Sequence, residues 1–589
     1  MQLSTEHLSA SAIENITKWL TELKYSEYIS ELELMIQSEQ WEQLEDAFFK
    51  VIEFGTGGRR GKTGIGSNRI NKVTIGESAQ ALCKYALSFD VYAAAKGIVI
   101  AYDTRVTSPE LSRFTAQVVA ANGFKTYLFD NFRATPELSF AVRHLGCAAG
   151  IVISASHNPP SDNGFKAYWS DGGQLVAPHD IGVLAMADKI KEVKSIDYTE
   201  AVSDGRIIAI SQEVDKAYIA AAAAEALGAD RDINIVYSPL HGTGSTSVLP
   251  VLKAAGFEHI SEVEAQMVPD GNFPTIPSGK PNPEEQSAND MAVAQLMAEK
   301  ADIAITNDPD ADRIGVMVRQ GDELVYLSGN QTAVLATDYV LKQLKNNYQL
   351  TSNHYIVKTI VTTDMLGAIA DYYGATMYSN LLIGFKYIGE LILAKENTEE
   401  IFVIGGEESY GLLKGTYCRD KDAATGALPL CEYAAELKKD GKTLYDRLLE
   451  LYVQHGVYVE RLDTMYCLGS TGFEKMQHIM ASLRKSAPSR IGVHDVTAIL
   501  DYSTLIRTDI ATGATSAIDC QKGNVIVLEF SDVRNRITIR PSGTEPKLKF
   551  YIQWFAYVND SSPVADQYNG LDKHLAELSV ELERFLATL

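Results

Sequence analysis

The amino-acid sequence predicts an α/β protein in which three related α/β domains are followed by a smaller α+β domain. One pattern recurs: a short β-rich run ends in a polar turn and a helical stretch begins, as in "KGIVIAYDTRVTSPE", "INIVYSPLHGTGSTS" and "HYIVKTIVTTDMLGAIADYYG". Apolar strands that alternate with helices are typical of parallel sheets covered on both faces. The chain has 589 residues, which is too many for a single hydrophobic core. Three widely spaced repeats of the pattern therefore indicate three domains of related design.

The first 48 residues are predicted to be helical. Ile13, Ile16, Leu20 and Leu23 recur at helical spacing. The segment carries no recognisable chemistry, so we expect a helical extension that packs on the first domain.

The ends of the repeating units can also be predicted from local residues. Ser108 is expected to cap the helix of the first unit, with Pro109 at the first helical position. Near the C-terminus, "VIVLEF", "RITIRPSG" and "LKFYIQWF" are predicted strands, and "LDKHLAELSVELERFLATL" is an amphipathic helix, which suits an α+β domain. We predict the extension and four domains at 1–48, 49–215, 216–330, 331–450 and 451–589.

Composition excludes several classes of protein. The net charge is -23, from 53 basic and 76 acidic residues, which argues against general binding to nucleic acid or to anionic membranes. The six cysteines are scattered without a CxxC pair, so neither a disulfide framework nor a structural zinc site is expected. Neither a signal peptide nor a membrane-spanning run is recognisable, and we expect a cytoplasmic protein.

Ligands of open α/β sheets bind beyond the carboxyl ends of the strands, so the loops there are the places to search. The first is "FGTGGRRGKTGIGSNRIN", where Arg59, Arg60 and Arg69 stand among glycines. Such a loop suits an anion, because glycines let backbone N–H groups approach it and arginine binds phosphate in bidentate fashion. It is not a nucleotide P-loop, since Thr56 replaces a required glycine and no clear strand precedes it. A flexible surface loop is the alternative.

The second loop is "IVISASHNPPSDNGFKAYW", in which Ser156 comes just after a predicted strand. Pro159 and Pro160 exclude a helix, and "DNG" predicts a turn before Lys166. The loop lacks the G-x-S-x-G elbow of acyl-transfer enzymes, and a sequence neighbour such as His157 is rarely oriented as the base of a triad. From this segment alone, the polar end of a buried strand is an equally good interpretation.

The third loop, "ADIAITNDPDADRIGVMV", follows a predicted strand and contains Asp308, Asp310 and Asp312. Three carboxylates at alternate positions of an extended loop can converge on one hard cation, and Mg²⁺ is the natural ion because it keeps positions open for phosphate oxygens. The loop is not an EF-hand, because Arg313 and Arg319 occupy positions where that motif needs glycine and glutamate. A solvated acidic turn is the alternative.

Two further loops carry polar residues after predicted strands. In "FVIGGEESYGLLKG", Glu407, Glu408 and Ser409 on a glycine turn suit the vicinal hydroxyls of a sugar, although a plain tight turn explains them as well. In "RITIRPSGTEPKLKFY", hydroxyls, turn amides and basic side chains form a nest for an anion, with a plain hairpin as the alternative. Its candidate residues are Arg540, Ser542, Gly543, Thr544, Lys547 and Lys549.

Together the segments "SASHNP", "DPDADR", "GEESYG" and "RPSGTEPK" resemble, in order and spacing, the phosphoserine, metal, sugar and phosphate loops of the α-D-phosphohexomutase superfamily, which includes phosphoglucomutase and phosphomannomutase. The resemblance covers nearly everything from about residue 50 to 555. The opening "FGTGGRRG" and "NRIN" are most similar to the longer branch that contains bacterial phosphoglucomutases and animal phosphopentomutase. The resemblance implies a heart-shaped, four-domain architecture with mixed sheets and an active site in the central cleft.

The resemblance also implies residue roles. Ser156 would carry the phosphoryl group and, with the three aspartates, bind one Mg²⁺ per chain, while Arg60 would bind the phosphoserine. Lys166 and Lys386, the latter in "IGFKYIGE", are the candidates for proton transfer, a role that the neighbouring His157 then loses. The implied substrate-binding residues are Arg313, Glu407, Ser409, Arg540, Ser542, Gly543, Thr544 and Lys549.

The implied activity is the interconversion of glucose 1-phosphate and glucose 6-phosphate through a phosphoserine enzyme and glucose 1,6-bisphosphate, with some phosphomannomutase activity. A phosphopentomutase and a sugar-bisphosphate synthase remain alternatives. An Mg-dependent serine phosphatase and a silent sugar-phosphate binding protein are rivals of another class. A phosphatase needs no second phosphate site, so "RPSGTEPK" favours the mutase. We expect sugar phosphates as the partners, no nucleic acid or membrane, and a monomer or weak dimer.

Overall fold

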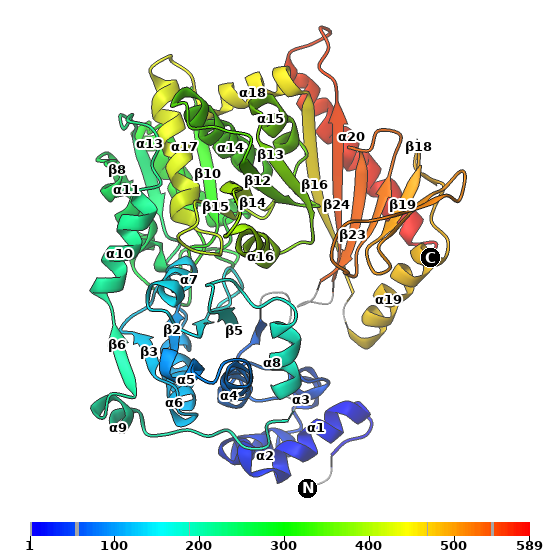
Figure 1. The fold of residues 1–589 in the computed structure, drawn as a ribbon. Coiled ribbons are helices and arrows are strands. Elements are labelled where there is room, and N and C mark those ends of the chain that lie inside the picture. Colours follow the sequence, from blue (N-terminus) through cyan, green and yellow to red (C-terminus); the bar gives the residue numbers. More distant parts are fainter. Residues whose placement is uncertain (1–2, 54–57, 188, 468, 543–546) are drawn as a thin grey trace.

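The computed structural model describes residues 3–53, 58–187, 189–467, 469–542 and 547–589 (Figure 1). Four large sheets follow one another along the chain. The first lies with the N-terminal helices at the bottom of Figure 1, and the fourth, coloured orange and red, lies on the upper right. Helices flank the first three sheets, whereas the fourth belongs to a β-rich C-terminal part. This arrangement confirms the predicted four-domain α/β architecture, while the individual domain boundaries stay predictions.

The N-terminal extension is helical, as predicted, and has its own small core. Trp19 lies at its centre, with its ring stacked on Tyr25 at a centroid distance of 4.4 Å. Ile65 and Val73 of the following segment complete this core, so the extension packs on the first sheet's domain. Its elements are α1 (Ala10–Thr21), η1 (Leu23–Tyr28), α2 (Ile29–Gln37) and α3 (Trp41–Phe48).

The first sheet has six strands in the order β1-β5-β4-β2-β3-β6 and is mixed. The strands β4, β2, β3 and β6 run parallel, and β5 and β1 are added antiparallel at one side. The strands are β1 (Arg59–Lys62), β2 (Ile98–Tyr102), β3 (Thr126–Phe129), β4 (Ala149–Ile153), β5 (Asp162–Trp169) and β6 (Ile207–Ile210). The helices are α4 (Lys72–Phe89), α5 (Ala93–Lys96), α6 (Ser108–Ala121), α7 (Thr135–His144), α8 (His179–Ala187), α9 (Tyr198–Ser203) and α10 (Gln212–Ala223).

Two local predictions in this region are wrong. The "DNG" segment is no turn but the beginning of β5, and the chain reverses just before it, where the amide of Asp162 donates to the carbonyl of Pro159 at 3.0 Å. Gly164 is required there, because a Cβ would lie 2.5 Å from the carbonyl oxygen of Ser154. Helix α6 begins at Ser108 rather than after it, since the Ser108 hydroxyl donates to the carboxylate of Asp103 at 2.6 Å and does not cap the helix.

The second and third sheets repeat the mixed design, with the orders β11-β10-β9-β7-β8 and β13-β12-β14-β15. In each, three parallel strands are extended by antiparallel strands at one edge. The strands are β7 (Ile235–Ser238), β8 (Ile260–Glu262), β9 (Ile303–Asn307), β10 (Ile314–Gln320), β11 (Glu323–Leu327), β12 (His354–Thr359), β13 (Thr376–Leu381), β14 (Ile401–Gly406) and β15 (Leu412–Lys414). The helices are η2 (Thr243–Ser245), α11 (Val248–Ala254), α12 (Glu264–Met267), η3 (Gln286–Ala288), α13 (Asp290–Glu299), α14 (Gly329–Asn346), α15 (Met365–Tyr373), α16 (Phe385–Lys395), α17 (Ala423–Lys438) and α18 (Leu444–His455).

The fourth sheet is antiparallel, with the order β16-β24-β23-β22-β19-β20-β21. The sequence predicted β22, β23, β24 and the C-terminal helix, but missed the half-exposed strands β19 to β21. The elements are β16 (Val457–Tyr466), α19 (Gly469–Lys485), β17 (Arg490–Ile491), β18 (His494–Asp495), β19 (Ala498–Asp501), β20 (Ile506–Asp509), β21 (Thr515–Ala517), β22 (Ile526–Glu529), β23 (Arg536–Pro541), β24 (Lys547–Ala556) and α20 (Val564–Leu586). Within the described ranges, every helix is too short or too polar to cross a membrane.

Candidate active site

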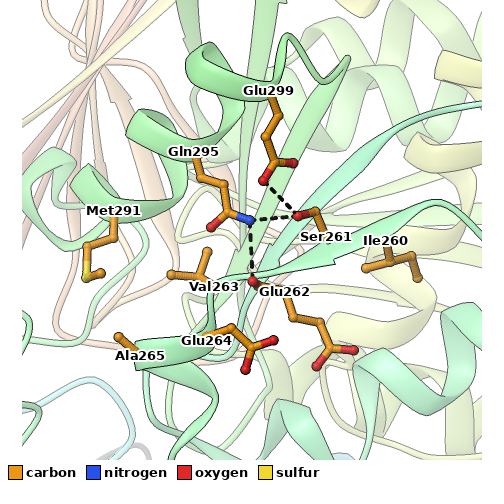
Figure 2. Close-up of a pocket in the computed structure, with 9 residues that line it drawn as sticks. All are labelled: Ile260, Ser261, Glu262, Val263, Glu264, Ala265, Met291, Gln295 and Glu299. Carbon is orange, nitrogen blue, oxygen red and sulfur yellow. Dashed lines mark hydrogen bonds between the residues drawn. The ribbon is translucent and has the colours of Figure 1, made fainter.

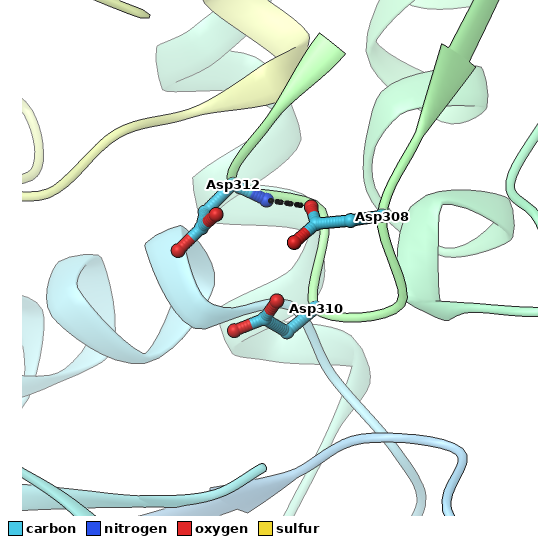
Figure 3. Close-up of side chains that lie close together, drawn as sticks. All are labelled: Asp308, Asp310 and Asp312. Carbon is cyan, nitrogen blue, oxygen red and sulfur yellow. Dashed lines mark hydrogen bonds between the residues drawn. The ribbon is translucent and has the colours of Figure 1, made fainter. Parts of the chain in front are cut away.

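Three buried carboxylates lie together in the loop that follows β9. One oxygen from each of Asp308, Asp310 and Asp312 lies within 4.8 Å of the others, and Figure 3 shows the carboxylates directed toward one another. The loop is tightly coiled, because Ala311 has a φ of 53° and its amide donates to the carbonyl of Asp308 at 2.9 Å. One oxygen of Asp308 also accepts the amides of Asp312 at 3.1 Å and Arg313 at 3.0 Å.

This loop fits a metal ion. An oxygen of Asp310 and one of Asp312 are buried without a hydrogen-bond partner among the described residues, which is costly unless a cation compensates. Burial and the neighbouring carboxylates raise the pKa of Asp308 well above its usual value. Burial would also raise the pKa of Asp310, but the charge of Lys166 outweighs it and holds that pKa well below the usual range. The group is therefore a concentrated negative site of the kind that binds a divalent cation.

Ser156 lies beyond the end of β4 and faces these carboxylates. Its hydroxyl donates to Asp308 at 2.6 Å, and its amide donates to the hydroxyl of Ser154 at 2.8 Å. The residue is buried and has a φ of 53°, a left-handed conformation that is uncommon for a residue with a side chain. The serine is thus held in a strained turn that places its oxygen at the aspartate loop, and it is more than the polar end of a strand.

Arg105 holds the serine loop in this shape, and it was not among the predicted site residues. The buried guanidinium donates to the carbonyls of Ser156 and Asn158 at 2.6 Å each, and also to those of Pro159 and Asp162. Its Nε is paired with Asp103 at 3.1 Å. The signal in the sequence is the "YDTR" segment at the end of a buried strand, where a charged pair needs partners.

His157 and Arg60 both lie at the serine loop. The Nδ1 atom of His157 lies 3.2 Å from the Oγ of Ser156. Burial and the charges of Arg313 and Arg60 lower the pKa of His157 well below its usual value, so the ring is neutral. Arg60, on the edge strand β1, donates to the side chain of Asn158 at 3.4 Å. The predicted grouping of Arg60 with the serine is therefore present in space.

Two lysines lie at the aspartates, and only one of them was predicted. Nζ of Lys166, on β5, lies 2.5 Å from Asp310 and 3.5 Å from Asp312. Nζ of Lys421 lies 3.1 Å from Asp312, reached past Gly411, where a Cβ would lie 2.1 Å from the lysine Cδ. The signal that could have found Lys421 is "RDKD", a charged run between two buried segments.

The predicted Lys386 is placed differently. It lies at the start of α16 and pairs with Asp180 of α8, at 3.2 Å. This ion pair joins the third sheet's domain to the first. No described contact brings Lys386 to the aspartate loop.

The sugar-loop candidates follow β14. Glu407 is buried, which raises its pKa, while the charges of Lys421 and Arg313 lower it. Burial and the charge of Glu407 raise the pKa of Glu408 to about 7. The loop packs closely on the start of α14, because a Cβ on Gly329 would lie 2.1 Å from the carbonyl oxygen of Glu408.

The phosphate-loop candidates lie where β23 and β24 meet. Arg540 and Lys549 are direct cross-strand neighbours, and the amide of Ser542 donates to the carbonyl of Lys547 at 2.8 Å. Gly543 and Thr544 lie outside the described residues. Burial lowers the pKa of Lys549, and the charges of Glu284 and Glu408 oppose that shift, so this loop is electrostatically linked to the second and third sheets.

Glu284 is a further residue of the site that was not predicted. Its carboxylate is paired with the guanidinium of Arg313 at 2.6 Å. It thus holds the arginine that directly follows the aspartate loop.

A surface hollow lies elsewhere, at the outer edge of the second sheet beside β8 and α13 (Figure 2). The side chain of Gln295 donates to the hydroxyl of Ser261 at 2.7 Å, and that hydroxyl donates to Glu299 at 3.0 Å. The hollow contains none of the predicted site residues, so we do not assign it to the active site. Its lining is Ile260, Ser261, Glu262, Val263, Glu264, Ala265, Met291, Gln295 and Glu299.

Comparison with known proteins agrees with this geometry. Sequence models described as phosphoglucomutase/phosphomannomutase, alpha/beta/alpha domains I, II and III match residues 51–194, 216–321 and 328–452. A phosphoglucomutase of Staphylococcus epidermidis is 34% identical over 516 residues, covering 87% of this chain and 92% of the relative. One from Staphylococcus aureus is 35% identical over 540 residues, covering 89% and 93%. A solved structure of a phosphoglucomutase/phosphomannomutase family protein from Burkholderia thailandensis, 18% identical, has a TM-score of 0.62 and covers 91% and 97%, and so shares the fold.

Proposed function

Because the chain belongs to the phosphoglucomutase/phosphomannomutase family and is an enzyme of the phosphoglucomutase kind, we propose that it interconverts glucose 1-phosphate and glucose 6-phosphate. The proposed route passes through a phosphorylated Ser156 and glucose 1,6-bisphosphate. The observation that supports it most directly is the 2.6 Å contact between the hydroxyl of Ser156 and Asp308, inside a loop whose other carboxylates have unpartnered oxygens. Some activity on mannose phosphates is part of the proposal.

In this proposal, Ser156 gives its phosphoryl group to the free hydroxyl of the bound sugar monophosphate and later takes back the other phosphate. Asp308, Asp310 and Asp312 would hold one Mg²⁺ together with the serine's oxygen. The ion would supply charge neutralisation for the phosphoryl group, which is the main requirement of phosphoryl transfer. Arg60, at the same loop, would bind the phosphoserine.

A proton must leave the attacking sugar hydroxyl and return to the serine side. Lys166 and Lys421 are buried at the aspartates, and the neutral His157 lies against Ser156, so all three lie near the reacting oxygen. Lys386 remains a candidate that would need to leave Asp180. We favour Lys421, because Lys166 is held by two aspartates and Lys421 by one carboxylate of that loop.

The sugar must be held in two orientations, one for each phosphate. Glu407 and Ser409 would bind its hydroxyls, and Arg313 would face the same centre. The phosphate that does not react would be bound at the fourth sheet by Arg540, Ser542, Gly543, Thr544 and Lys549. The pairing of Arg540 with Lys549 across β23 and β24 supports this second site, which a phosphatase would not need.

A purified-enzyme assay tests the proposal. Glucose, mannose, ribose and deoxyribose 1-phosphates are compared side by side, with and without the matching sugar bisphosphate. We expect the highest kcat/KM with glucose 1-phosphate, a lower value with mannose 1-phosphate, and dependence on the bisphosphate as activator. A preference for a pentose phosphate would establish the phosphopentomutase instead. Net release of inorganic phosphate without isomerisation would establish the serine phosphatase.

A further inference from the structure

The N-terminal extension lies outside the part of the chain that the family models match, since the first match begins at residue 51. Its last helix, α3, nevertheless contacts the segment 58–71, which carries Arg60. This segment will be called the arginine segment. Because Arg60 is assigned to the phosphoserine, the contacts of α3 concern the chemistry as well as the fold.

A single carboxylate of the extension binds two cations of the arginine segment. Oδ2 of Asp46 lies 2.6 Å from Nη2 of Arg69 and 3.0 Å from Nζ of Lys62. The backbone carbonyl of Asp46 accepts a second hydrogen bond from Arg69 at 3.0 Å and one from the side chain of Asn68 at 3.2 Å. One residue of α3 therefore holds both ends of the turn that follows β1.

The backbones are also in close contact. The amide of Asn68 donates to the carbonyl of Ala47 at 2.9 Å, and the amide of Ile52 donates to the carbonyl of Ser67 at 2.9 Å. Gly66 has a φ of 134°, and a Cβ there would lie 2.5 Å from the carbonyl oxygen of Ala47. Only a glycine allows this approach, so the arginine segment is fitted to α3 along its length.

The other side of the arginine segment is joined to the serine loop. The amide of Thr63 donates to the carbonyl of Ser161 at 2.8 Å, and Arg60 pairs with Gly164 in the register of β1 and β5. Arg60 also donates to Asn158, two residues after Ser156. In the described sheet β1 is the terminal strand, held on one side by β5, so its free side depends on other contacts.

We propose that α3 positions the serine loop through the arginine segment, with Asp46 as the principal positioning residue. This inference rests on the proposed function, because it concerns the transfer of a phosphoryl group at Ser156. Asp46 contacts neither substrate nor Ser156. It acts by fixing Lys62 and Arg69, and through them the strand that presents Arg60. A displacement of about 1 Å in such a group can lower a rate by about 100-fold.

The test compares Asp46→Asn with Asp46→Glu, which keeps the charge. Glu42→Gln is the matched control, because Glu42 is an exposed carboxylate on the same helix. Asp46 is half exposed, and exposed ion pairs contribute about 0–1 kcal/mol to stability, so the variants are expected to fold. Single-turnover phosphorylation of Ser156 by glucose 1,6-bisphosphate and the steady-state KM for glucose 1-phosphate are measured.

We expect Asp46→Asn to slow phosphorylation of Ser156 about tenfold while KM changes less than about twofold. Asp46→Glu should recover most of the rate, and Glu42→Gln should equal the wild type. A wild-type rate in Asp46→Asn, or an equal loss in Glu42→Gln, would overturn the inference. A parallel loss of rate and melting temperature, without recovery in Asp46→Glu, would assign a purely structural role and overturn it as well.

Hydrogen exchange gives a readout that does not depend on catalysis. In Asp46→Asn, the amides of residues 58–71 and of the serine loop should exchange faster than in the wild type, while α4 keeps its protection. Unchanged exchange in both segments would contradict the coupling. If the wild type showed no phosphorylation of Ser156 but exchange still rose, the proposed function would fail while the mechanical link between α3 and the serine loop stood.

Discussion

The hydroxyl of Ser156 donates to Asp308 across a separation of 152 residues, at 2.6 Å. The serine comes from the loop after β4 of the first sheet, and the aspartate comes from the loop after β9 of the second. Both loops lie at carboxyl ends of parallel strands, where α/β sheets place their ligands. The contact therefore joins the two domains at the point where a phosphoryl group and a metal ion would meet.

Ser156→Ala is expected to abolish mutase activity, by at least about 1,000-fold, because alanine cannot carry a phosphoryl group. The fold should survive, since the loop is held by backbone contacts to Arg105. Activity and protein mass after incubation with glucose 1,6-bisphosphate are the measurements. Ser161→Ala, an exposed serine of the same loop, is the control. Wild-type turnover in Ser156→Ala would refute the assignment.

Removal of the metal ion with EDTA is expected to stop turnover, and Mg²⁺ should restore it. Asp310→Asn should weaken Mg²⁺ binding about tenfold or more, because one charged ligand of three is lost. Titration calorimetry of the purified protein with Mg²⁺ measures this. Asp322→Asn, on the exposed turn between β10 and β11, is the control. Equal affinity in Asp310→Asn and the wild type would show that the ion binds elsewhere.

Lys421→Met is expected to lower kcat about 100-fold or more, as general acid–base groups contribute about 10²- to 10⁴-fold. Its pH profile of kcat should lose one limb, because a protonating group is gone. Lys386→Met, measured alongside, should change KM more than kcat. Lys439→Met, an exposed lysine at the end of α17, is the control. A normal kcat and pH profile in Lys421→Met would return the role to Lys166, Lys386 or His157.

Arg540→Ala is expected to raise the KM for glucose 1-phosphate about tenfold, which corresponds to the loss of about 1.4 kcal/mol from a charged phosphate contact. The single-turnover rate at saturating substrate should fall much less. Arg507→Ala, which removes an arginine paired with Glu529 on the same sheet, is the control. An unchanged KM would remove Arg540 from the second phosphate site.

Glu137, on α7, makes the stability of the protein depend on pH. It is fully buried, and its two oxygens have no hydrogen-bond partner among the described residues. Burial and the charge of Asp215 raise its pKa well above the usual value. The unfolded chain ionises this group near pH 4.3, whereas the folded chain keeps it protonated, so wild-type stability falls as pH rises above about 4.3.

Glu137→Gln mimics the protonated form and should remove that loss. The variant should exceed the wild type in melting temperature by more at pH 8 than at pH 5, since a tenfold change in a protonation equilibrium corresponds to about 1.4 kcal/mol. Thermal unfolding at the two pH values measures this, with Glu213→Gln, an exposed residue of α10, as the control. An equal difference at both pH values would show that Glu137 is ionised in the folded protein.

Much of the fold was predictable because its signals are local. Short apolar strands, polar turns and helical periodicity indicated three α/β units and a β-rich end, and these predictions are confirmed. The errors at "DNG" and Ser108 have a tertiary cause. Gly164 is required by the carbonyl of Ser154, and Ser108 is drawn to Asp103, and neither contact can be read from neighbouring residues.

By itself, the sequence determined which side chains stand at strand ends, because the order of Ser156, Asp308, Glu407 and Arg540 along the chain is covalent. Only the tertiary structure decided which of them meet. Arg105 and Lys421 join the site through contacts over dozens to hundreds of residues, and Lys386 is paired with Asp180 instead. Local propensity has a range of a few residues, whereas the packing of sheets against one another brings distant loops within hydrogen-bonding distance. The chemistry of the site therefore follows from the fold as a whole.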